Sequence, residues 1–408
     1  MDVVGPGAAV TRPEVAPDSP FGADNLPYGV FAPRGGTARC GARYGDYVLD
    51  LAVALDDPMF AAPTLNPFLA QGPTRWREVR ERLRALVDGE IPAAAVHALS
   101  DVLLGLPIRI GDYVDFYASI DHATNLGRLF RPDAEPLLPN WRHLPVGYHG
   151  RSGTVVVSGT EIIRPQGQRA TPSGTPEFGP SRRLDIEAEL GFVVGAGSTL
   201  GVPIGVDDFA EHVFGVALVN DWSARDIQAW EYQPLGPFLG KSFATSMSAW
   251  ITPLDALDAA RVPLPEQSPP PLPYLTAAEP WGLDIDLRVD WDGVTVAHPP
   301  YRRMYWSPAQ MLAHLTVNGA ATRTGDLFAS GTISGPGRDQ LGSFIELTRG
   351  GTEPVDLNGA PRTFLEDGDE VVITATAPGT GGTRIGLGEV RGRILPAGWI
   401  PPQPQSET

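Results

Sequence analysis

The sequence predicts a mainly β protein of the α+β class, with a small N-terminal domain and a large C-terminal barrel or roll that carries inserted helices. From about residue 106 onward, short alternating apolar stretches follow one another, each bounded by turn residues. Glycine and proline make up 89 of the 408 residues, as expected for many short strands joined by turns. Few segments have the apolar spacing of a helix.

The N-terminal segments divide into a tail and a small domain. Residues 1–17 are expected to form a loose tail. Residues 18–105 contain short apolar runs such as "YGVFAP", then the helical stretch "WREVRERLRALV" and a second expected helix near residues 93–104. These features indicate a small α+β domain. No cluster of titratable groups in it points to catalysis.

Residues 106–408 are expected to form one large domain, whose predicted strands include "LDIEAELGFVV", "VFGVALVND", "FIELTRGG", "DEVVITATA" and "TRIGLGEVRGRIL". The Asp-Gly pair of "WDGVTV" predicts a hairpin turn. A helix over "SARDIQAWEY" would begin with a capping box of Ser223 and Asp226. A helix over "WSPAQMLAHLTVNGA" would begin at Ser307 and stop at Asn318-Gly319. Residues 261–280 read as a proline-rich loop.

Charge and cysteine content exclude several classes of protein. The net charge of −17 argues against nucleic acids or anionic membranes as partners. The single cysteine, Cys40, cannot form an intrachain disulfide and is expected to be a small buried residue. There is no apolar run of about 18 residues and no signal-peptide pattern, so a cytoplasmic enzyme is the default expectation.

Lys241 stands out because it is the only lysine among 31 basic residues. It lies in "PLGPFLGKSFATS", where most neighbours are apolar or small. A site that kept lysine while arginine filled every other basic position is expected to need a compact ammonium group. The alternative is chance survival at a tolerant position.

Acidic residues gather on one predicted strand. In "RRLDIEAELGFVV", Arg182 to Val194, one face is apolar and the other carries Asp185, Glu187 and Glu189. Like charges at this spacing repel, so a hard cation held by Glu187 and Glu189 would explain them. The alternative is an exposed polar face, and no histidine or cysteine cluster suggests zinc.

Two aspartates lie where they could complete such a cation site. Asp221 ends the apolar strand "VFGVALVND", just before a predicted helix, and would otherwise cap that helix. Asp115 lies between aromatic residues in "YVDFY", where a carboxylate needs a partner.

Candidates for acid–base and oxyanion chemistry flank these acids. His122 follows Asp115 by seven residues in "DFYASIDHATN" and is a candidate general base, although a lone histidine is more often structural. Arg225, Gln228 and Tyr232 share one face of a predicted helix, where they could stabilise an oxyanion or simply face solvent. The sequence has no G-x-S-x-G or H-E-x-x-H motif.

Several long motifs carry a family resemblance: "DSPFGADNLPYGVF", "DFYASIDHATN", "LLPNWRHLPVGYHGR", "LVNDWSARDIQAWEYQPLGPFLGKSF" and "ASGTISG". From about Asp18 to Pro396 the chain resembles the fumarylacetoacetase family. The resemblance implies an SH3-like N-terminal domain, a mixed β-roll C-terminal domain and a homodimer. It also implies hydrolysis of the carbon–carbon bond of 4-fumarylacetoacetate, a small diketo acid, to fumarate and acetoacetate, the last step of tyrosine and phenylalanine degradation.

The resemblance also implies roles for individual residues. The matching Ca²⁺ ligands are Asp115, Glu187, Glu189 and Asp221, and a structural Mg²⁺ would use Asp221, Lys241 through its backbone, and Thr245. The matching catalytic residues are His122 as base, Glu346 as the carboxylate that orients it, and Arg225, Gln228 and Lys241 as oxyanion stabilisers. The matching substrate contacts are Tyr117, Arg131, Tyr148, Gln228, Tyr232 and Thr332.

One departure and two alternatives accompany this assignment. The "SID" before His122 is less basic than the family pattern, so Asp121 could change the basicity of the histidine. One alternative is a related metal-dependent activity on β-keto acids: acylpyruvate hydrolysis, decarboxylation or muconate-type isomerisation. The other is a non-catalytic, calcium-stabilised binding protein, which would have no use for His122 or Lys241.

Overall fold

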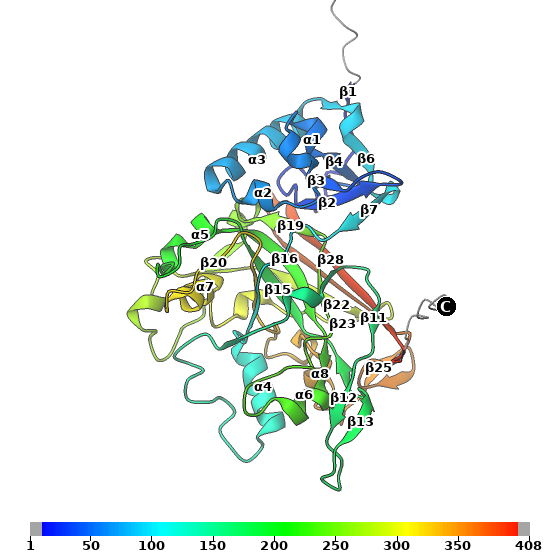
Figure 1. The fold of residues 1–408 in the computed structure, drawn as a ribbon, viewed down its shortest axis with the longest axis vertical. Helices are drawn as coiled ribbons and strands as arrows, with labels where there is room; N and C mark the ends of the chain where they lie inside the picture. Colours follow the sequence, from blue (N-terminus) through cyan, green and yellow to red (C-terminus); the bar gives the residue numbers. More distant parts are fainter. Residues whose placement is uncertain (1–9, 399–408) are drawn as a thin grey trace, which may run out of the picture.

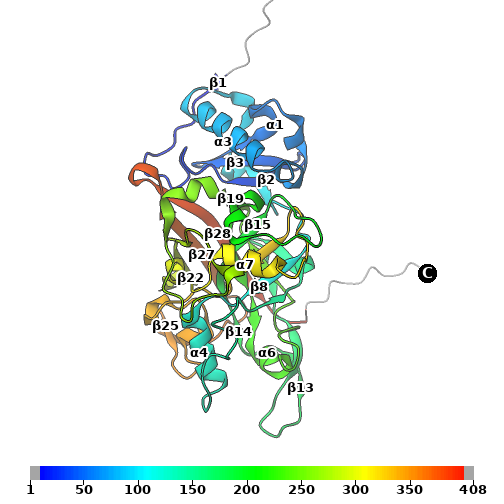
Figure 2. The ribbon, with the colours of Figure 1, turned by 90° about the vertical axis from the view of Figure 1, so that its left-hand side faces the viewer.

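The computed structural model describes residues 10–398. It is mixed α/β with mainly strands, and a smaller N-terminal part sits on one end of a larger C-terminal part, as Figures 1 and 2 show. The predicted fold class is confirmed. No helix among the described residues is long and apolar enough to cross a lipid bilayer.

The N-terminal part joins a small sheet to helix α3, which covers the predicted stretch "WREVRERLRALV" and buries Trp76, Val79 and Leu83. The prediction of a helix near residues 93–104 is wrong, because these residues form β6, β7 and short 3₁₀ turns. The elements are β1 (Val10–Thr11), β2 (Tyr28–Pro33), β3 (Arg39–Tyr44), β4 (Tyr47–Asp50), α1 (Leu51–Ala54), α2 (Asn66–Leu69), α3 (Pro73–Asp88), β5 (Ile91–Pro92), β6 (Val96–Ala98) and β7 (Val102–Gly105).

Part of the expected N-terminal tail takes a defined position. Residues 1–9 lie outside the described residues, whereas β1 pairs with β5 in antiparallel register.

A 13-stranded sheet runs through both parts in the order β6-β4-β3-β2-β19-β16-β15-β24-β8-β9, with β7, β10 and β18 paired to its side. The link between the parts is the antiparallel pair of β2 with β19. The strands that the C-terminal part contributes to this sheet are β8 (Tyr113–Phe116), β9 (Gly147–His149), β10 (Val155–Val157), β15 (Ala188–Val194), β16 (Val213–Asp221), β18 (Thr245–Met247), β19 (Trp250–Pro253) and β24 (Leu327–Ala329).

A second, five-stranded sheet follows the order β11-β28-β27-β22-β23. Its hairpin turns at Asp292-Gly293, which confirms the turn predicted from "WDGVTV", and both residues have positive φ. Its strands are β11 (Ile162–Ile163), β22 (Asp286–Trp291), β23 (Val294–Ala297), β27 (Glu370–Pro378) and β28 (Arg384–Leu395).

Short ribbons and helices fill the rest of the C-terminal part. The ribbons are β12 (Gln166–Arg169) with β13 (Glu177–Pro180), β14 (Leu184–Asp185) with β17 (Ser223–Ala224), β20 (Arg261–Pro263) with β21 (Trp281–Leu283), and β25 (Val355–Leu357) with β26 (Ala360–Arg362). The helices are α4 (Ile120–Phe130), α5 (Phe209–His212), α6 (Arg225–Glu231), α7 (Pro308–Thr316) and α8 (Phe344–Leu347). The expected proline-rich loop, residues 261–280, contains β20 and a 3₁₀ turn.

The helix predictions succeed in part. Ser307 caps α7 in a reciprocal capping box with Gln310, as predicted. The capping box predicted for "SARDIQAWEY" is wrong: Ser223 lies in β17, and Asp226 accepts from the Ser181 hydroxyl and the Arg182 amide instead. "FIELTRGG", predicted as a strand, begins with the short helix α8.

The acidic strand is also interrupted. It was predicted as continuous from Arg182 to Val194, but it breaks between β14 and β15, and Glu187 lies in the break. The side chain of Asn220 accepts the Glu187 amide at 3.1 Å, which satisfies the backbone where the strand is interrupted. Glu187 and Glu189 therefore do not project from neighbouring pleats of one strand.

Candidate functional site

A cavity of about 420 Å³ opens between α4, α6 and the end of β8. In Figures 1 and 2, α4 and α6 lie at the end of the molecule away from the N-terminal part. Eleven of the predicted site residues line this cavity: Asp115, Tyr117, His122, Arg131, Tyr148, Glu187, Arg225, Gln228, Tyr232, Lys241 and Thr332. Residues from distant parts of the sequence thus meet in one place.

Three of the four predicted metal ligands converge. Asp115 comes from β8, Glu187 from the break between β14 and β15, and Asp221 from the end of β16. Each offers a carboxylate oxygen, and these oxygens lie within 4.8 Å of one another. Glu189 is fully buried nearby but is not part of this close group, and its Oε2 accepts the Gly331 amide at 3.2 Å.

The ammonium group of Lys241 lies among these carboxylates and balances part of their negative charge. Its ammonium Nζ donates to Glu187 Oε2 and, at 2.8 Å, to Asp221 Oδ2. Although burial acts to raise it, Lys241 and Arg225 hold the pKa of Glu187 well below its usual range. The same carboxylates raise the pKa of Lys241 against the effect of burial. The only lysine of the chain is therefore a buried ammonium rather than a surface charge.

Two carboxylate oxygens at this described site are buried without a hydrogen-bond partner: Asp115 Oδ1 and Glu189 Oε1. Burial, together with the neighbouring carboxylates, raises the pKa of both residues well above the usual range. Buried acids without partners are costly unless they are protonated or bind a cation. A hard, oxygen-preferring divalent cation fits this donor set, which contains no sulfur or histidine nitrogen.

The charge balance supports the same fit. Asp115, Asp185, Glu187, Glu189 and Asp221 are all buried, whereas the buried cations among them are Arg225 and Lys241. The carboxylates thus outnumber the cations by three when all are ionised. A bound divalent cation would remove most of that excess.

His122 and Glu346 form a buried pair. The hydroxyl of Ser119 caps α4 by accepting a hydrogen bond from the His122 amide at 3.2 Å, and this fixes the start of the helix that carries the imidazole. His122 Nδ1 lies 2.6 Å from Glu346 Oε2. Since a carboxylate only accepts, Nδ1 carries a proton, and in the neutral ring Nε2 then has the lone pair. The ring lines the cavity and meets Tyr117 edge to face, with ring centroids 5.3 Å apart.

Glu346 is held as a carboxylate by several donors. Asn125 Nδ2 donates to Oε1 at 2.9 Å, and the hydroxyls of Ser334 and Ser343 donate to Oε2 at 2.9 and 2.7 Å. Burial opposes ionisation, but His122, Asn125 and Ser343 still keep the pKa of Glu346 below its usual value. Sequence reasoning missed all three donors; only Asn125, three residues after His122 on α4, had a usable spacing signal.

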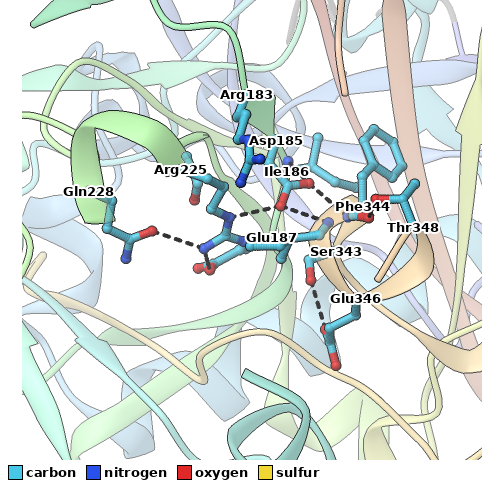
Figure 3. Close-up of polar contacts among 12 residues, drawn as sticks. Arg183, Asp185, Ile186, Glu187, Arg225, Gln228, Ser343, Phe344, Glu346 and Thr348 are labelled. Carbon is cyan, nitrogen blue, oxygen red and sulfur yellow. Dashed lines mark hydrogen bonds and ion pairs between the residues drawn. The ribbon is translucent and has the colours of Figure 1, made fainter. Parts of the chain in front are cut away.

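Arg225 joins the acids to the helix α6. Its Nη1 lies 2.7 Å from Glu187 Oε1 and donates to Gln228 Oε1 at 3.2 Å. Its Nε donates to Asp185 Oδ2 at 2.8 Å. Figure 3 shows this chain of contacts, with Asp185 on one side of the guanidinium and Gln228 on the other. Asp185 was recognised in the sequence as an acid but given no role there.

The predicted substrate contacts differ in how they are held. Tyr148 donates to Asp221 Oδ2 at 3.3 Å, and Arg131 donates to the Pro136 carbonyl at 2.7 Å. The hydroxyl of Thr332 is buried without a partner. Tyr232 ends α6 beside Gln233, whose amide donates to its hydroxyl at 3.0 Å. All four face the same cavity as His122.

A second cavity of about 290 Å³ lies beside the acids, and Asp221, Lys241 and Thr245 line it. Thr245 Oγ1 donates to Asp221 Oδ1 at 2.7 Å. The three residues expected to hold Mg²⁺ are therefore neighbours. Asp121, the residue before His122, forms an ion pair with Arg303 at 3.1 Å.

Two family models match this chain. "Fumarylacetoacetase N-terminal" matches residues 24–107, and "Fumarylacetoacetate (FAA) hydrolase C-terminal" matches residues 113–395. The chain belongs to the fumarylacetoacetase family. The resemblance predicted from the motifs is confirmed.

Relatives cover nearly the whole length of this fumarylacetoacetase-family chain. Fumarylacetoacetase of Homo sapiens is 48% identical over 411 residues, which is 94% of this chain and 98% of that protein. Fumarylacetoacetase of Arabidopsis thaliana is 45% identical over 413 residues with the same coverage.

Solved structures support the fold alone. Fumarylacetoacetate hydrolase from Exiguobacterium antarcticum has a TM-score of 0.57 at 17% identity, covering 91% of this chain and 99% of that one. Maleylpyruvate hydrolase from Sphingobium has a TM-score of 0.53 at 16% identity, covering 91% of this chain and 100% of that one.

Proposed function

We propose that this chain hydrolyses the carbon–carbon bond of 4-fumarylacetoacetate to give fumarate and acetoacetate, the last step of tyrosine and phenylalanine degradation. The observation that carries the proposal is the buried His122–Glu346 pair, which shares one cavity with a group of carboxylates suited to a hard cation. The full-length similarity to curated fumarylacetoacetases supports the same substrate.

The proposed metal ligands are Asp115, Glu187, Glu189 and Asp221, and Ca²⁺ is the proposed ion because it accepts many oxygen ligands in flexible geometry. When bound, the ion would act as a Lewis acid on carbonyl oxygens of the substrate. A second, structural ion, Mg²⁺, is proposed at Asp221, the backbone of Lys241 and Thr245. The two carboxylate oxygens without partners support the first of these sites.

His122 is proposed to activate water. Glu346 holds the proton on Nδ1, so Nε2 is the atom that can take a proton from a water molecule in the cavity. The hydroxide then attacks the carbonyl carbon of the fumaryl group, which becomes a carboxylate of fumarate. The positive charge that develops on the imidazole is stabilised by the Glu346 carboxylate, which stays ionised.

Arg225, Gln228 and Lys241 are proposed to stabilise the alkoxide that this attack creates. Arg225 and Lys241 are buried cations already held in place by Glu187, so little reorganisation is needed when negative charge develops. The carbon–carbon bond then breaks, and acetoacetate leaves with its electron pair. The leaving carbon takes up a proton, which restores neutral His122 and completes the addition of one water.

Tyr117, Arg131, Tyr148, Gln228, Tyr232 and Thr332 are proposed to contact the substrate. Arg131 is the cation suited to a substrate carboxylate, because a guanidinium can donate two parallel hydrogen bonds. The unpartnered hydroxyl of Thr332 supports a contact with a ligand atom, since it has no protein partner.

The proposal includes a cytoplasmic homodimer. Apolar side chains at the two cavities are strongly exposed, Leu235 at 95% and Phe238 at 65%, which favours coverage by a second copy. The proposed domains are a segment over 1–17, whose strand β1 pairs with β5, an SH3-like domain over 18–105 and a catalytic domain over 106–408. The family-model matches at 24–107 and 113–395 are compatible with these bounds.

The test is direct product analysis. The purified protein is mixed with 4-fumarylacetoacetate, and fumarate and acetoacetate are measured by chromatography with and without a chelator. The proposal expects both products in equal amounts, and loss of turnover after chelation. His122→Ala should lower kcat far more than it weakens Ca²⁺ binding.

Each alternative gives a different result in the same assay. Turnover of acylpyruvates or β-keto acids without turnover of 4-fumarylacetoacetate would assign the chain to a related activity. Calcium binding without any turnover would identify a binding protein. Equal losses of turnover and Ca²⁺ binding in His122→Ala would place His122 among the metal ligands instead.

A further inference from the structure

Asp185 connects the two halves of the candidate site. Its side chain is fully buried, and it lies at the end of β14, just before the break that carries Glu187. Its two carboxylate oxygens accept hydrogen bonds from groups on two different helices, α6 and α8. Figure 3 shows Asp185 between Arg225 and Phe344.

The contact with α6 fixes the guanidinium of Arg225. Asp185 Oδ2 accepts from Nε at 2.8 Å, while Nη1 of the same group reaches Glu187 at 2.7 Å. The backbone adds a second constraint, because the Arg225 amide donates to the Arg183 carbonyl at 2.9 Å. The guanidinium plane is thus held from two sides, and its orientation depends on where Asp185 lies.

The contact with α8 fixes the helix that carries Glu346. The backbone amides of Phe344 and Ile345, the first two residues of α8, donate to Asp185 at 2.7 and 3.0 Å. Ser343, directly before the helix, has no side-chain bond to these amides and instead donates to Glu346. Asp185, 159 residues away in the sequence, therefore takes the place of a local cap.

Four donors converge on this one carboxylate, since the Ile186 amide also donates to Oδ1 at 2.8 Å. An ionised carboxylate only accepts, so it suits a site where every neighbour donates. An asparagine in this position would turn its NH₂ group toward one of these donors, and the two helices could not both keep their contacts.

We propose that Asp185 is a positioning residue that sets the geometry between Arg225 and the His122–Glu346 pair. One rigid side chain holds the guanidinium that faces the alkoxide and the helix whose glutamate orients the base. This inference rests on the proposed hydrolytic function. A purely structural buried ion pair would stabilise the fold without linking these two groups.

Asp185→Asn is the test variant, and Asp50→Asn is its matched control. Asp50 is also buried, pairs with Arg39 Nε at 2.5 Å, and accepts the amides of Ala52 and Val53 at the start of a short helix. It lies in the N-terminal part, away from the cavity. Asp185→Asn should lower kcat about 100-fold with a much smaller change in KM, because small misplacements of reacting groups cost about this much.

A double variant separates positioning from stability. In a Glu346→Gln background, where the base is already misoriented, Asp185→Asn should cost kcat only about 10-fold or less, because both changes disable the same arrangement. Asp50→Asn should leave kcat unchanged in either background. If the fold-losses of kcat caused by Asp185→Asn and Glu346→Gln multiply in full in the double variant, the proposal is overturned.

A measurement without substrate keeps this inference distinct from the function itself. His122 Nδ1 lies 2.6 Å from Glu346 Oε2. The proton in this hydrogen bond should give a far-downfield NMR signal that disappears in His122→Ala. Asp185→Asn should shift or broaden this signal, and Asp50→Asn should not. An unchanged signal would overturn the proposal, whatever the protein hydrolyses.

Failure to fold is also informative. If Asp185→Asn yields no folded protein, Asp185→Ser leaves room for a water molecule to accept the displaced amides, and the same measurements apply. Failure of both variants to fold would assign Asp185 to folding alone and overturn its positioning role.

Discussion

Three acidic residues at alternate positions, Asp185, Glu187 and Glu189, lie in three different environments. Asp185 faces Arg225 and the amides of α8, Glu187 faces Lys241 and Arg225, and Glu189 keeps one oxygen without a partner. The crowding of like charges along this segment is therefore relieved unequally. The carboxylate oxygen of this segment that lacks a hydrogen-bond partner belongs to Glu189, which lies near Asp115, where the proposed cation would bind.

Lys241→Arg should impair turnover on the order of 100-fold, although the charge is kept. Nζ is a compact donor that bridges Glu187 and Asp221, and a planar guanidinium cannot occupy the same space with the same contacts. Steady-state kinetics with 4-fumarylacetoacetate measure the effect. Arg338→Lys, at an exposed ion pair with Glu353, is the control and should have normal kcat. Near-normal turnover of Lys241→Arg would make the single lysine an accident of composition.

Glu346 should contribute to the acid sensitivity of the protein. Its pKa is lower in the folded than in the unfolded chain, so its carboxylate stabilises the fold fully above about pH 4.5, and this stability is lost as the pH falls further. Urea unfolding at several pH values between about 5 and 3 should show a shallower decline in unfolding free energy for Glu346→Gln than for the wild type. Glu353→Gln should keep the wild-type slope. An equally steep decline in Glu346→Gln would show that this carboxylate is not preferentially ionised in the fold.

The helices and strands show which parts of the fold the sequence could predict. Segments whose signals are local, such as α3, α7 and the Asp292-Gly293 hairpin, form as predicted. Segments that depend on distant partners do not. The α8 helix is capped by Asp185 from another part of the chain, and the strand break at Glu187 depends on the side chain of Asn220. Periodicity alone cannot reveal such contacts.

The site residues show the same division. His122, Asp115 and Asp221 could be predicted from unusual local surroundings, whereas Glu346 was identified only through the family resemblance. Its supporting donors Ser334 and Ser343 gave no local signal, because their role depends on how α4 and α8 come together. The burial and countercharges of the acids likewise required the tertiary structure.

Gly331 follows β24, and its backbone passes close to the end of β8. Its φ is +75°, its amide donates to Glu189, and a Cβ there would lie 2.1 Å from the Phe116 carbonyl oxygen. Gly331→Ala should therefore destabilise the protein by at least about 4 kcal/mol in chemical unfolding and reduce turnover of the folded fraction.

Gly293→Ala is the matched control for this prediction. Its φ is similar, +77°, but nothing lies within 4 Å of the added Cβ. It should cost about 1–2 kcal/mol from backbone strain alone and leave turnover unchanged. Equal losses of stability in the two variants would show that the close approach to Phe116 is unimportant.

The whole described chain is expected to unfold as one unit, because its two parts share a sheet and a core. Strand β2 pairs with β19, and Phe214 of the C-terminal part packs among Tyr28, Phe68 and Trp76, with ring centroids 5.3 to 5.7 Å apart. Phe214→Ala should lower stability by about 3–5 kcal/mol while differential scanning calorimetry still shows a single transition. A separate low-temperature transition for residues 18–105 would contradict this coupling.

The account as a whole depends on a divalent cation among the buried carboxylates. Crystals grown with Ca²⁺ should show an anomalous scattering peak between Asp115, Glu187 and Asp221, with Glu189 also in contact and oxygen distances of about 2.3–2.6 Å. A well-ordered crystal structure in excess Ca²⁺ with no anomalous peak there, and only the Lys241 ammonium between Glu187 and Asp221, would contradict it.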